Sequence, residues 1–223
     1  SIPDNADQNI EWVTWQEMEM TMSSVDAVVN LAGAGIMDKR WTSKRKRELR
    51  NSRVERTQQV VDAIRRSGHP RTLISASAIG YYGEQDATPI NEKMPKGEGF
   101  LVSLCGQWEE AANIDIRTVI MRFGIVLSAQ GGALVKMARP FKFGLGGPVG
   151  NGNQGFSWVH INDAVGLMLF AIDNSELAGA VNVTAPNPIT NRQLASALGS
   201  QFRRPVILPV PPIILRILLG ERS

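Results

Sequence analysis

Four hydroxyl groups stand close together in one stretch of this chain, at Ser75, Ser77, Tyr81 and Tyr82. They begin within the apolar run of residues 72–76, which is typical of a buried strand, and continue just beyond it. A serine hydroxyl can polarise a carbonyl group, and a phenol can give up or accept a proton. We therefore regard Ser77 and Tyr81 as candidate catalytic residues. The alternative is that the two tyrosines only pack against a bound ligand.

Positive charge is concentrated between residues 39 and 56. This segment contains nine Lys or Arg and two Glu, a net charge of +7, whereas the rest of the chain carries −4. Such a segment indicates an anionic ligand or a nucleic acid at one face, although a solvated helix face would look the same. A nucleic acid is disfavoured because Trp41 is the only aromatic residue among these cations and no nucleic-acid-binding motif is present.

Two glycines, Gly33 and Gly35, follow the apolar run of residues 26–30. The dinucleotide-binding fingerprint needs a third glycine at position 38, where this chain has Asp38. The segment therefore does not fit the first phosphate-binding turn of a dinucleotide fold. It fits the end of a later strand, where small residues let a flat ring or a sugar lie against the backbone. A plain tight turn is the alternative.

Composition excludes several classes of protein. With 43% hydrophobic and 20% charged residues, the chain is neither disordered nor collagen-like. The single cysteine, Cys105, excludes an internal disulfide and a cysteine-based zinc site, and fits a reducing, cytoplasmic compartment. We expect Cys105 in the core and His160 in a structural role, and we find no metal-ligand spacing. No apolar run reaches the ~20 residues of a membrane span, and the start does not resemble a signal peptide.

Apolar strands alternate with amphipathic helices along the chain. We expect strands at residues 26–30, 72–76, 117–122, 157–160, 180–184 and 204–208. We expect helices at residues 43–67, 100–112, 131–139, 163–174 and 191–200. Short apolar strands without polar alternation are buried on both faces, which predicts an α/β fold with a Rossmann-like, doubly wound parallel sheet. The first three strands should be parallel neighbours, with ligands at their carboxyl ends.

Ordered segments along almost the whole chain carry a resemblance to a known family. They are VVNLAG at 28–33, RWTSKRKRELRNSRVERT at 40–57, LISASAIGYYG at 73–83, LCGQWEEAA at 104–112, MRFGIVL at 121–127, GGALVKM at 131–137, FGLGGPVGNGNQGFSWVHINDA at 143–164 and VNVTAPNPITN at 181–191. Together they resemble the atypical short-chain dehydrogenase/reductases of the NAD-dependent epimerase family, of the YfcH and SDR39U1 type. The resemblance implies a dinucleotide-binding core at 1–127. Residues 128–223 would hold a glycine-rich loop and a small C-terminal substrate-binding lobe, and would partly return to the core.

The chain departs from the family pattern in two ways. The family opens with a strand and a glycine-rich turn that holds the cofactor pyrophosphate, and it continues beyond residue 223; we expect the printed sequence to lack both parts. Ordinary short-chain dehydrogenases also use a Tyr-x-x-x-Lys pair for acid/base chemistry. Neither tyrosine here has Lys four residues later, and Phe100 stands where related enzymes carry the tyrosine. The second departure favours an atypical member of the group.

The resemblance also implies which residues touch the cofactor. These are Leu31, Ala32, Glu48, Arg53 and Val126, and we add Gly33 and Ser75, which lie at the same strand ends. Glu48 and Arg53 are separated by about 140° around a helix, so they can border one groove. Arg53 is a fixed positive charge inside the basic segment and suits the 2′-phosphate of NADP(H). We therefore expect NADP(H) rather than NAD(H).

Two classes of function remain open. One is an NADP(H)-dependent oxidoreductase or nucleoside-diphosphate-sugar epimerase acting on a small molecule. The other is a catalytically silent, cofactor-binding regulatory protein, which the missing Tyr-x-x-x-Lys pair favours. We expect the substrate pocket between residues 75–83 and the glycine-rich loop 144–155, with Ser77 and Tyr81 facing it and the loop acting as a lid or as a plain connection. We expect a cytoplasmic monomer or homodimer that binds neither metal, nucleic acid nor membrane.

Overall fold

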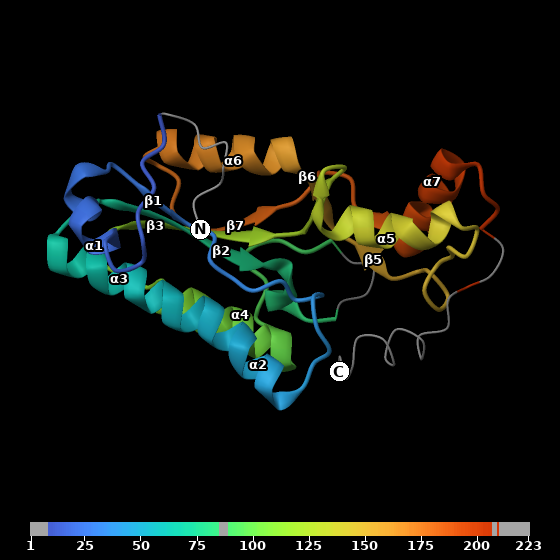
Figure 1. Ribbon diagram of the computed structural model, residues 1–223, viewed down its shortest axis with the longest axis horizontal. Helices are drawn as coiled ribbons and strands as arrows, with labels where there is room; N and C mark the ends of the chain where they lie inside the picture. The colour runs from blue at the N-terminus through green and yellow to red at the C-terminus, as the bar shows by residue number, and fades with distance from the viewer. Residues whose placement is uncertain (1–8, 85–88, 207–208, 210–223) are drawn as a thin grey trace.

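The computed structural model describes residues 9–84, 89–206 and 209 (Figure 1). Its centre is a sheet of four strands in the order β1-β2-β3-β7, all parallel. The strands are β1 (Val28–Asn30), β2 (Thr72–Ala78), β3 (Arg117–Phe123) and β7 (Gly179–Val183). This confirms the predicted α/β fold and the predicted parallel pairing of the first three strands.

Helices cover both faces of this sheet, as Figure 1 shows. One face carries α2 (Ser43–Arg50), η2 (Asn51–Glu55), α3 (Arg56–Ser67) and α4 (Phe100–Ala111), and the other carries α6 (Ile161–Asp173). The first three form the single helix predicted at 43–67, with a π-helical turn at η2. Thr42 caps its start by accepting a hydrogen bond from the Arg45 backbone N–H, and Gly68 ends it in a left-handed conformation (φ 71°).

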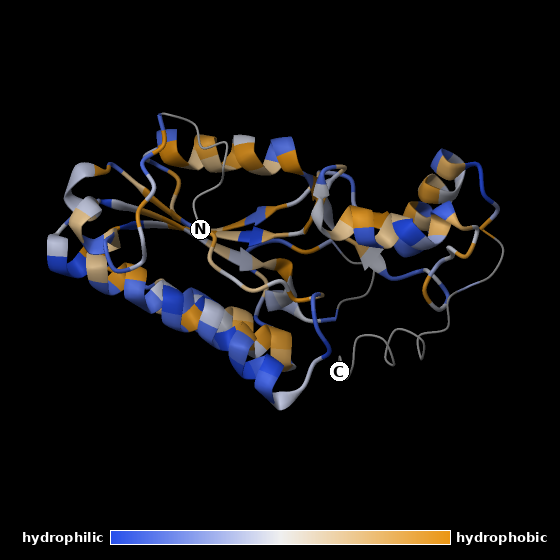
Figure 2. Ribbon diagram, viewed as in Figure 1, coloured by the Kyte–Doolittle hydropathy of each residue, from blue (hydrophilic) through white to orange (hydrophobic). Residues whose placement is uncertain are grey.

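The core lies between the sheet and these helices. Val61 and Ile64 of α3 pack with Leu73 of β2 on one face of the sheet. On the other face, Val119 of β3 packs with Ala171 of α6. Figure 2 shows the outward side of α2 and α3 as largely hydrophilic, which fits their apolar stripes facing the sheet.

A smaller lobe stands beyond the carboxyl ends of the strands (Figure 1). It contains α5 (Gly132–Lys142), α7 (Asn191–Phe202) and a short antiparallel pair, β5 (Gly155–Phe156) with β8 (Ile189–Thr190). β4 (Ile125–Ser128) and β6 (Trp158–His160) pair in parallel between core and lobe. The lobe has its own apolar cluster, in which Phe141 of α5 packs with Leu194 and Leu198 of α7. The predicted boundary at residues 127/128 stays a prediction, but α6 and β7 do return to the core.

Three short elements complete the described structure: α1 (Met18–Thr21), η1 (Met22–Ser24) and η3 (Ile79–Tyr82). Three predictions for the C-terminal half need correction. Residues 204–206 form no strand, and residues 207 and 208 lie outside the described residues. Ser157 precedes β6 rather than belonging to it. The helix expected at 163–174 begins earlier, at Ile161, because the His160 imidazole caps it: its Nδ1 accepts a hydrogen bond from the Asn162 N–H. Within the described parts of the chain, no helix is both long and apolar enough to cross a bilayer.

Candidate functional site

Buried hydrogen bonds hold the backbone that follows β1 in place. The Asn30 amide donates to the Thr57 hydroxyl oxygen (2.8 Å), which also accepts from the Trp108 indole N–H (3.0 Å). The side-chain oxygen of Asn30, Oδ1, in turn accepts from the Ala32 backbone N–H (3.2 Å). Leu31 between them leaves 53% of its surface exposed. The predicted contacts Leu31 and Ala32 therefore form a fixed, partly apolar surface at the carboxyl end of the strand.

Arg53 lies directly beneath the next residue, Gly33. A Cβ atom added at Gly33 would stand 3.2 Å from the Arg53 guanidinium carbon, so glycine is what lets the cation approach the backbone. Arg53 is only 7% exposed and lies over the Trp108 ring at 5.1 Å. Within the described chain, no carboxylate lies within 4 Å of it, and its hydrogen bonds go to the Leu49 carbonyl and the Ser52 hydroxyl. Burial lowers the pKa of this guanidinium, and the nearby charge of Arg45 adds to the effect.

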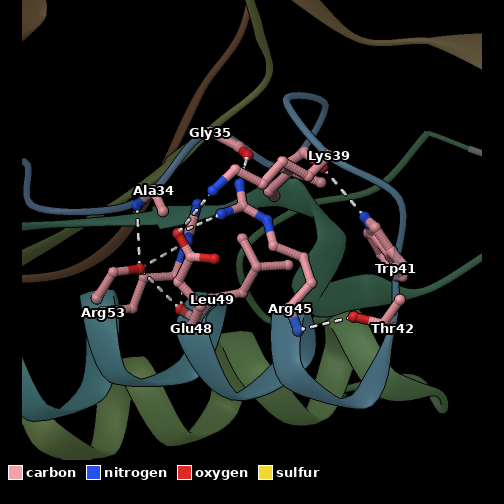
Figure 3. Close-up of polar contacts among 11 residues, drawn as sticks. Ala34, Gly35, Lys39, Trp41, Thr42, Arg45, Glu48, Leu49 and Arg53 are labelled. Atoms are coloured by element: carbon pink, nitrogen blue, oxygen red, sulfur yellow. Dashed lines mark hydrogen bonds and ion pairs between the residues drawn. The ribbon is translucent and has the colours of Figure 1, made fainter.

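A second buried arginine shapes the rest of this loop (Figure 3). Arg45 donates to the Gly35 carbonyl oxygen and forms an ion pair with Glu48 (2.6 Å). The Trp41 indole N–H donates to the Ile36 carbonyl (3.1 Å), which ties the loop to the start of α2. The hydrogen bond from Arg45 holds the pKa of the Glu48 carboxyl below its usual range. Glu48 therefore borders the same loop as Arg53, but Arg45 already engages its carboxylate.

A buried ion pair occupies the carboxyl ends of β2 and β3. Arg122 and Glu109 are 5% and 14% exposed and meet through two parallel hydrogen bonds (2.9 and 2.8 Å). Burial lowers the pKa of Arg122, but the hydrogen bonds to Glu109 and Tyr82 outweigh it, so the net shift is upward. The Ser77 hydroxyl donates to the same Glu109 carboxylate (2.6 Å) and is 2% exposed. The Ser77 hydroxyl is therefore engaged by Glu109, and the expectation that Ser77 faces the substrate pocket stays a prediction.

The two tyrosines surround the same arginine. Arg122 donates to the Tyr82 phenol oxygen (2.9 Å), and the Tyr82 hydroxyl donates to Asn182 of β7 (2.8 Å). The Arg122 guanidinium carbon lies 3.6 Å from the centre of the Tyr81 ring, which meets Tyr82 edge to face. Tyr82 is buried, whereas Tyr81 is half-buried. Of the two phenols, Tyr81 is the better placed to reach a ligand, and its catalytic role stays a prediction.

Cys105 of α4 is packed against η3, close to where the missing lysine would stand. A Cβ atom added at Gly80 would lie 3.7 Å from its sulfur. Burial, with a smaller contribution from the Glu109 charge, raises the pKa of the thiol to about 11. At neutral pH the group is a protonated thiol, so it behaves as a core residue, as the sequence suggested.

The residues predicted to contact the cofactor do not all lie together in the structure. Ser75 is fully buried inside β2 opposite Asn30, and its hydroxyl has no hydrogen-bond partner among the residues that the structure describes. Val126 pairs with Val159 in the strands between core and lobe. A hollow of about 420 Å³ runs along β1 and is lined by Leu31 and Ala32, whereas another of about 320 Å³ lies between α1 and α3. Neither is lined by the predicted catalytic residues, so the substrate pocket at 75–83 and 144–155 stays a prediction.

Hydrogen bonds join the glycine-rich loop of residues 144–155 to α7. The Asn191 side chain accepts from the Val149 N–H (2.7 Å), and the Arg192 N–H donates to the Gly152 carbonyl (2.9 Å). A side chain at Gly152 would press on Pro148 and Arg192, and its φ is 71°. These contacts favour the plain connection over the lid.

Sequence reasoning missed the residues that organise the site: Asn30, Arg45, Thr57, Trp108, Glu109 and Arg122. For Arg122 and Glu109 a signal existed, since a charged residue inside an apolar run has to be paired when buried. No such signal marked Thr57 or Asn30, because polar residues of this size are common on exposed surfaces. In the described part of the chain, no group of three or more His, Cys, Asp or Glu could hold a metal ion.

Comparison with known proteins identifies a matching family, curated relatives and similar solved structures. A family described as "NAD dependent epimerase/dehydratase family" matches residues 7–184. "Epimerase family protein SDR39U1 homolog, chloroplastic" from Arabidopsis thaliana is 43% identical over 201 residues, which are 87% of this chain and 58% of that protein. The crystal structure of human epimerase family protein SDR39U1 (isoform 2) with NADPH superimposes with a TM-score of 0.88 at 34% identity, over 94% of this chain and 74% of that one.

A more distant structure, described as the nucleoside-diphosphate sugar epimerase from Corynebacterium glutamicum, gives a TM-score of 0.72 at 28% identity and covers 92% of this chain. The chain spans 45% of that structure, and 58% and 66% of the Arabidopsis thaliana and Mycobacterium leprae relatives. The shared part is therefore the fold described above, and the longer relatives contain further residues.

Proposed function

Because the chain belongs to the NAD dependent epimerase/dehydratase family, we propose that it binds NADP(H) at the carboxyl end of β1. The proposed activity is that of an atypical short-chain dehydrogenase/reductase, either an oxidoreductase or a nucleoside-diphosphate-sugar epimerase acting on a small molecule. The nicotinamide would supply hydride transfer. The chain's own residues would hold the cofactor and shield it from water.

The observation that carries this proposal is the buried Arg53 without a carboxylate partner in the described chain. A buried cation is costly unless an anion or several hydrogen bonds compensate it. Arg53 lies against Gly33, two residues after the exposed Leu31, so a cofactor phosphate could approach the cation while a ring lies on the leucine. The proposal extends to this chain what is known of human SDR39U1, whose crystal contains NADPH.

Fluorescence titration of the intact protein with NADPH and with NADH tests the cofactor. We expect tighter binding of NADPH, because the 2′-phosphate adds a charge in a basic environment. Equal or tighter binding of NADH would refute the choice of cofactor. Gly33→Val is a second probe: its side chain would press on the Arg53 guanidinium and cover the backbone next to it, and should weaken NADPH binding.

A catalytically silent regulatory protein is the second candidate. One observation favours it: Ser77 is buried and bonded to Glu109, so its hydroxyl is not free to polarise a substrate carbonyl. Incubating the intact protein and NADPH with a panel of carbonyl compounds and nucleotide sugars separates the two. Oxidation of NADPH or interconversion of a sugar supports the enzyme, and tight binding without turnover supports the regulatory protein. If turnover is found, Tyr81→Phe tests whether the Tyr81 phenol is the acid.

A further inference from the structure

Asp38 occupies the position that would be glycine in a dinucleotide-binding turn, and in the structure its side chain makes specific contacts within this loop and with the lobe. Its carboxylate folds back over Gly35, where any side chain would collide with it. The loop that carries it is fastened to the helix below: the Ala34 N–H donates to Ser52 (3.0 Å), and Arg45 donates to the Gly35 carbonyl. Asp38 therefore belongs to a loop that is hydrogen-bonded to the helix at Ala34 and Gly35 and that begins at Gly33, the residue in contact with Arg53.

The partner of Asp38 comes from the lobe. Lys136 of α5 reaches across from 98 residues further along the chain and donates to the Asp38 carboxylate at 2.7 Å. This hydrogen bond and the positive charge of Lys136 hold the pKa of the Asp38 carboxyl below its usual range. Elsewhere, the apolar side of α5 packs within the lobe, against β4 and α7. The pair thus joins the loop after β1 to a helix of the lobe.

We propose that Asp38 and Lys136 are positioning residues that hold the C-terminal lobe against the loop after β1 and so retain the bound cofactor. The inference rests on the proposed function, because retention presupposes that NADP(H) lies on Leu31 to Gly33. Both side chains are about half exposed, 50% for Asp38 and 56% for Lys136. The contact can therefore open and re-form without unfolding either element.

The expected effect is modest and measurable. Exposed ion pairs contribute about 0.2–1 kcal/mol, which corresponds to a change of about 1.5- to 5-fold in a rate or an affinity. In stopped-flow displacement, Lys136→Met should release NADPH faster by this factor, and Lys136→Arg, which keeps the charge, should release it at close to the wild-type rate. Raising the salt concentration should speed release from the wild type by a larger factor than from Lys136→Met, because the variant has lost the ion pair but keeps the attraction between Arg53 and the cofactor phosphate. Arg66→Met is the matched control, because it breaks the exposed Arg66–Glu19 pair on α3 and α1.

Hydrogen exchange of the cofactor-free protein separates this inference from the proposed function. Lys136→Met should increase deuterium uptake in residues 33–41, whereas Lys136→Arg and Arg66→Met should not. Unchanged uptake in Lys136→Met, or equal defects in Lys136→Met and Lys136→Arg, would overturn the positioning role. Normal NADPH release from Lys136→Met would overturn retention. Failure of the wild type to bind NADPH would instead refute the proposed function, while the exchange result still decides whether the contact holds the loop.

Discussion

Replacing Glu109 by leucine is the sharpest perturbation of the buried network at the carboxyl ends of β2 and β3. Glu109 accepts two hydrogen bonds from Arg122 and one from Ser77. Without the carboxylate, Arg122 stays buried at 5% exposure and loses its ion-pair partner, keeping only contacts with uncharged groups such as the Tyr82 oxygen and the Tyr81 ring. Loss of one partner from a buried ion pair costs about 3–5 kcal/mol of stability. For a domain of this size that corresponds to a fall in Tm of roughly 6–20 °C.

Thermal unfolding by circular dichroism and urea denaturation at neutral pH measure this loss. Glu109→Leu/Arg122→Met removes both charges, so it should be more stable than Glu109→Leu alone. Arg66→Met, which breaks an exposed pair, should cost at most about 1 kcal/mol. If Glu109→Leu costs no more than Arg66→Met, the buried pair does not hold the turn of Ser77 to Tyr82, and the reasoning fails.

Two further predictions concern the neighbours of this network. The Cys105 thiol is 4% exposed with a pKa of about 11, above its ordinary value of 9.0, so iodoacetamide should leave it unmodified in the native protein at pH 8 and alkylate it after unfolding. Since the thiol's pKa is higher in the folded than in the unfolded state, its contribution to the free energy of unfolding is complete below about pH 9 and is lost as the pH rises through 11. Across that window the wild type should lose on the order of 2–3 kcal/mol more of its free energy of unfolding than Cys105→Ala. Identical pH dependence of urea denaturation in the two proteins would contradict the pKa shift. Thr57→Val keeps the shape of the side chain but leaves the Asn30 amide and the Trp108 indole N–H without their acceptor, and it should cost about 2–4 kcal/mol in urea denaturation. Thr118→Val, which removes one local hydrogen bond to the Ile116 carbonyl, is the control, and equal losses would show that Thr57 has no special role.

The sheet could be predicted from the sequence because burial on both faces leaves a plain mark: β1, β2 and β3 are apolar runs without alternation. The helix at 43–67 was equally readable from its apolar spacing and from Gly68 at its end. The predicted strand at 204–208 was wrong over residues 204–206, because an apolar run after a basic turn does not reveal whether a partner strand lies beside it. β5 and β8 are too short for a periodic pattern to mark them, and β4 follows the end of β3 after one residue, so no turn signal separates the two strands.

Only part of the candidate site could be predicted from the sequence. Arg53 was predicted from the resemblance and Gly33 from its place after the first strand, and the structure brings them into contact. Ser77 was expected to face a pocket, but its orientation depends on Glu109, which lies 32 residues away in the sequence. Long-range pairs of this kind, like Lys136 with Asp38, leave no mark in local spacing, so only the fold reveals them.

The central claim is that Arg53 holds a cofactor phosphate at the carboxyl end of β1. Its most direct test is the affinity of the intact protein for NADPH and NADH, measured for wild type, Arg53→Met and Arg47→Met, the last being an exposed cation of the same basic segment. Loss of a charged hydrogen bond of about 1.5–3 kcal/mol predicts that Arg53→Met weakens NADPH binding by about 10- to 100-fold and narrows its advantage over NADH. Arg47→Met should stay close to wild type. Unchanged NADPH affinity in Arg53→Met, with the fold intact, would contradict the account.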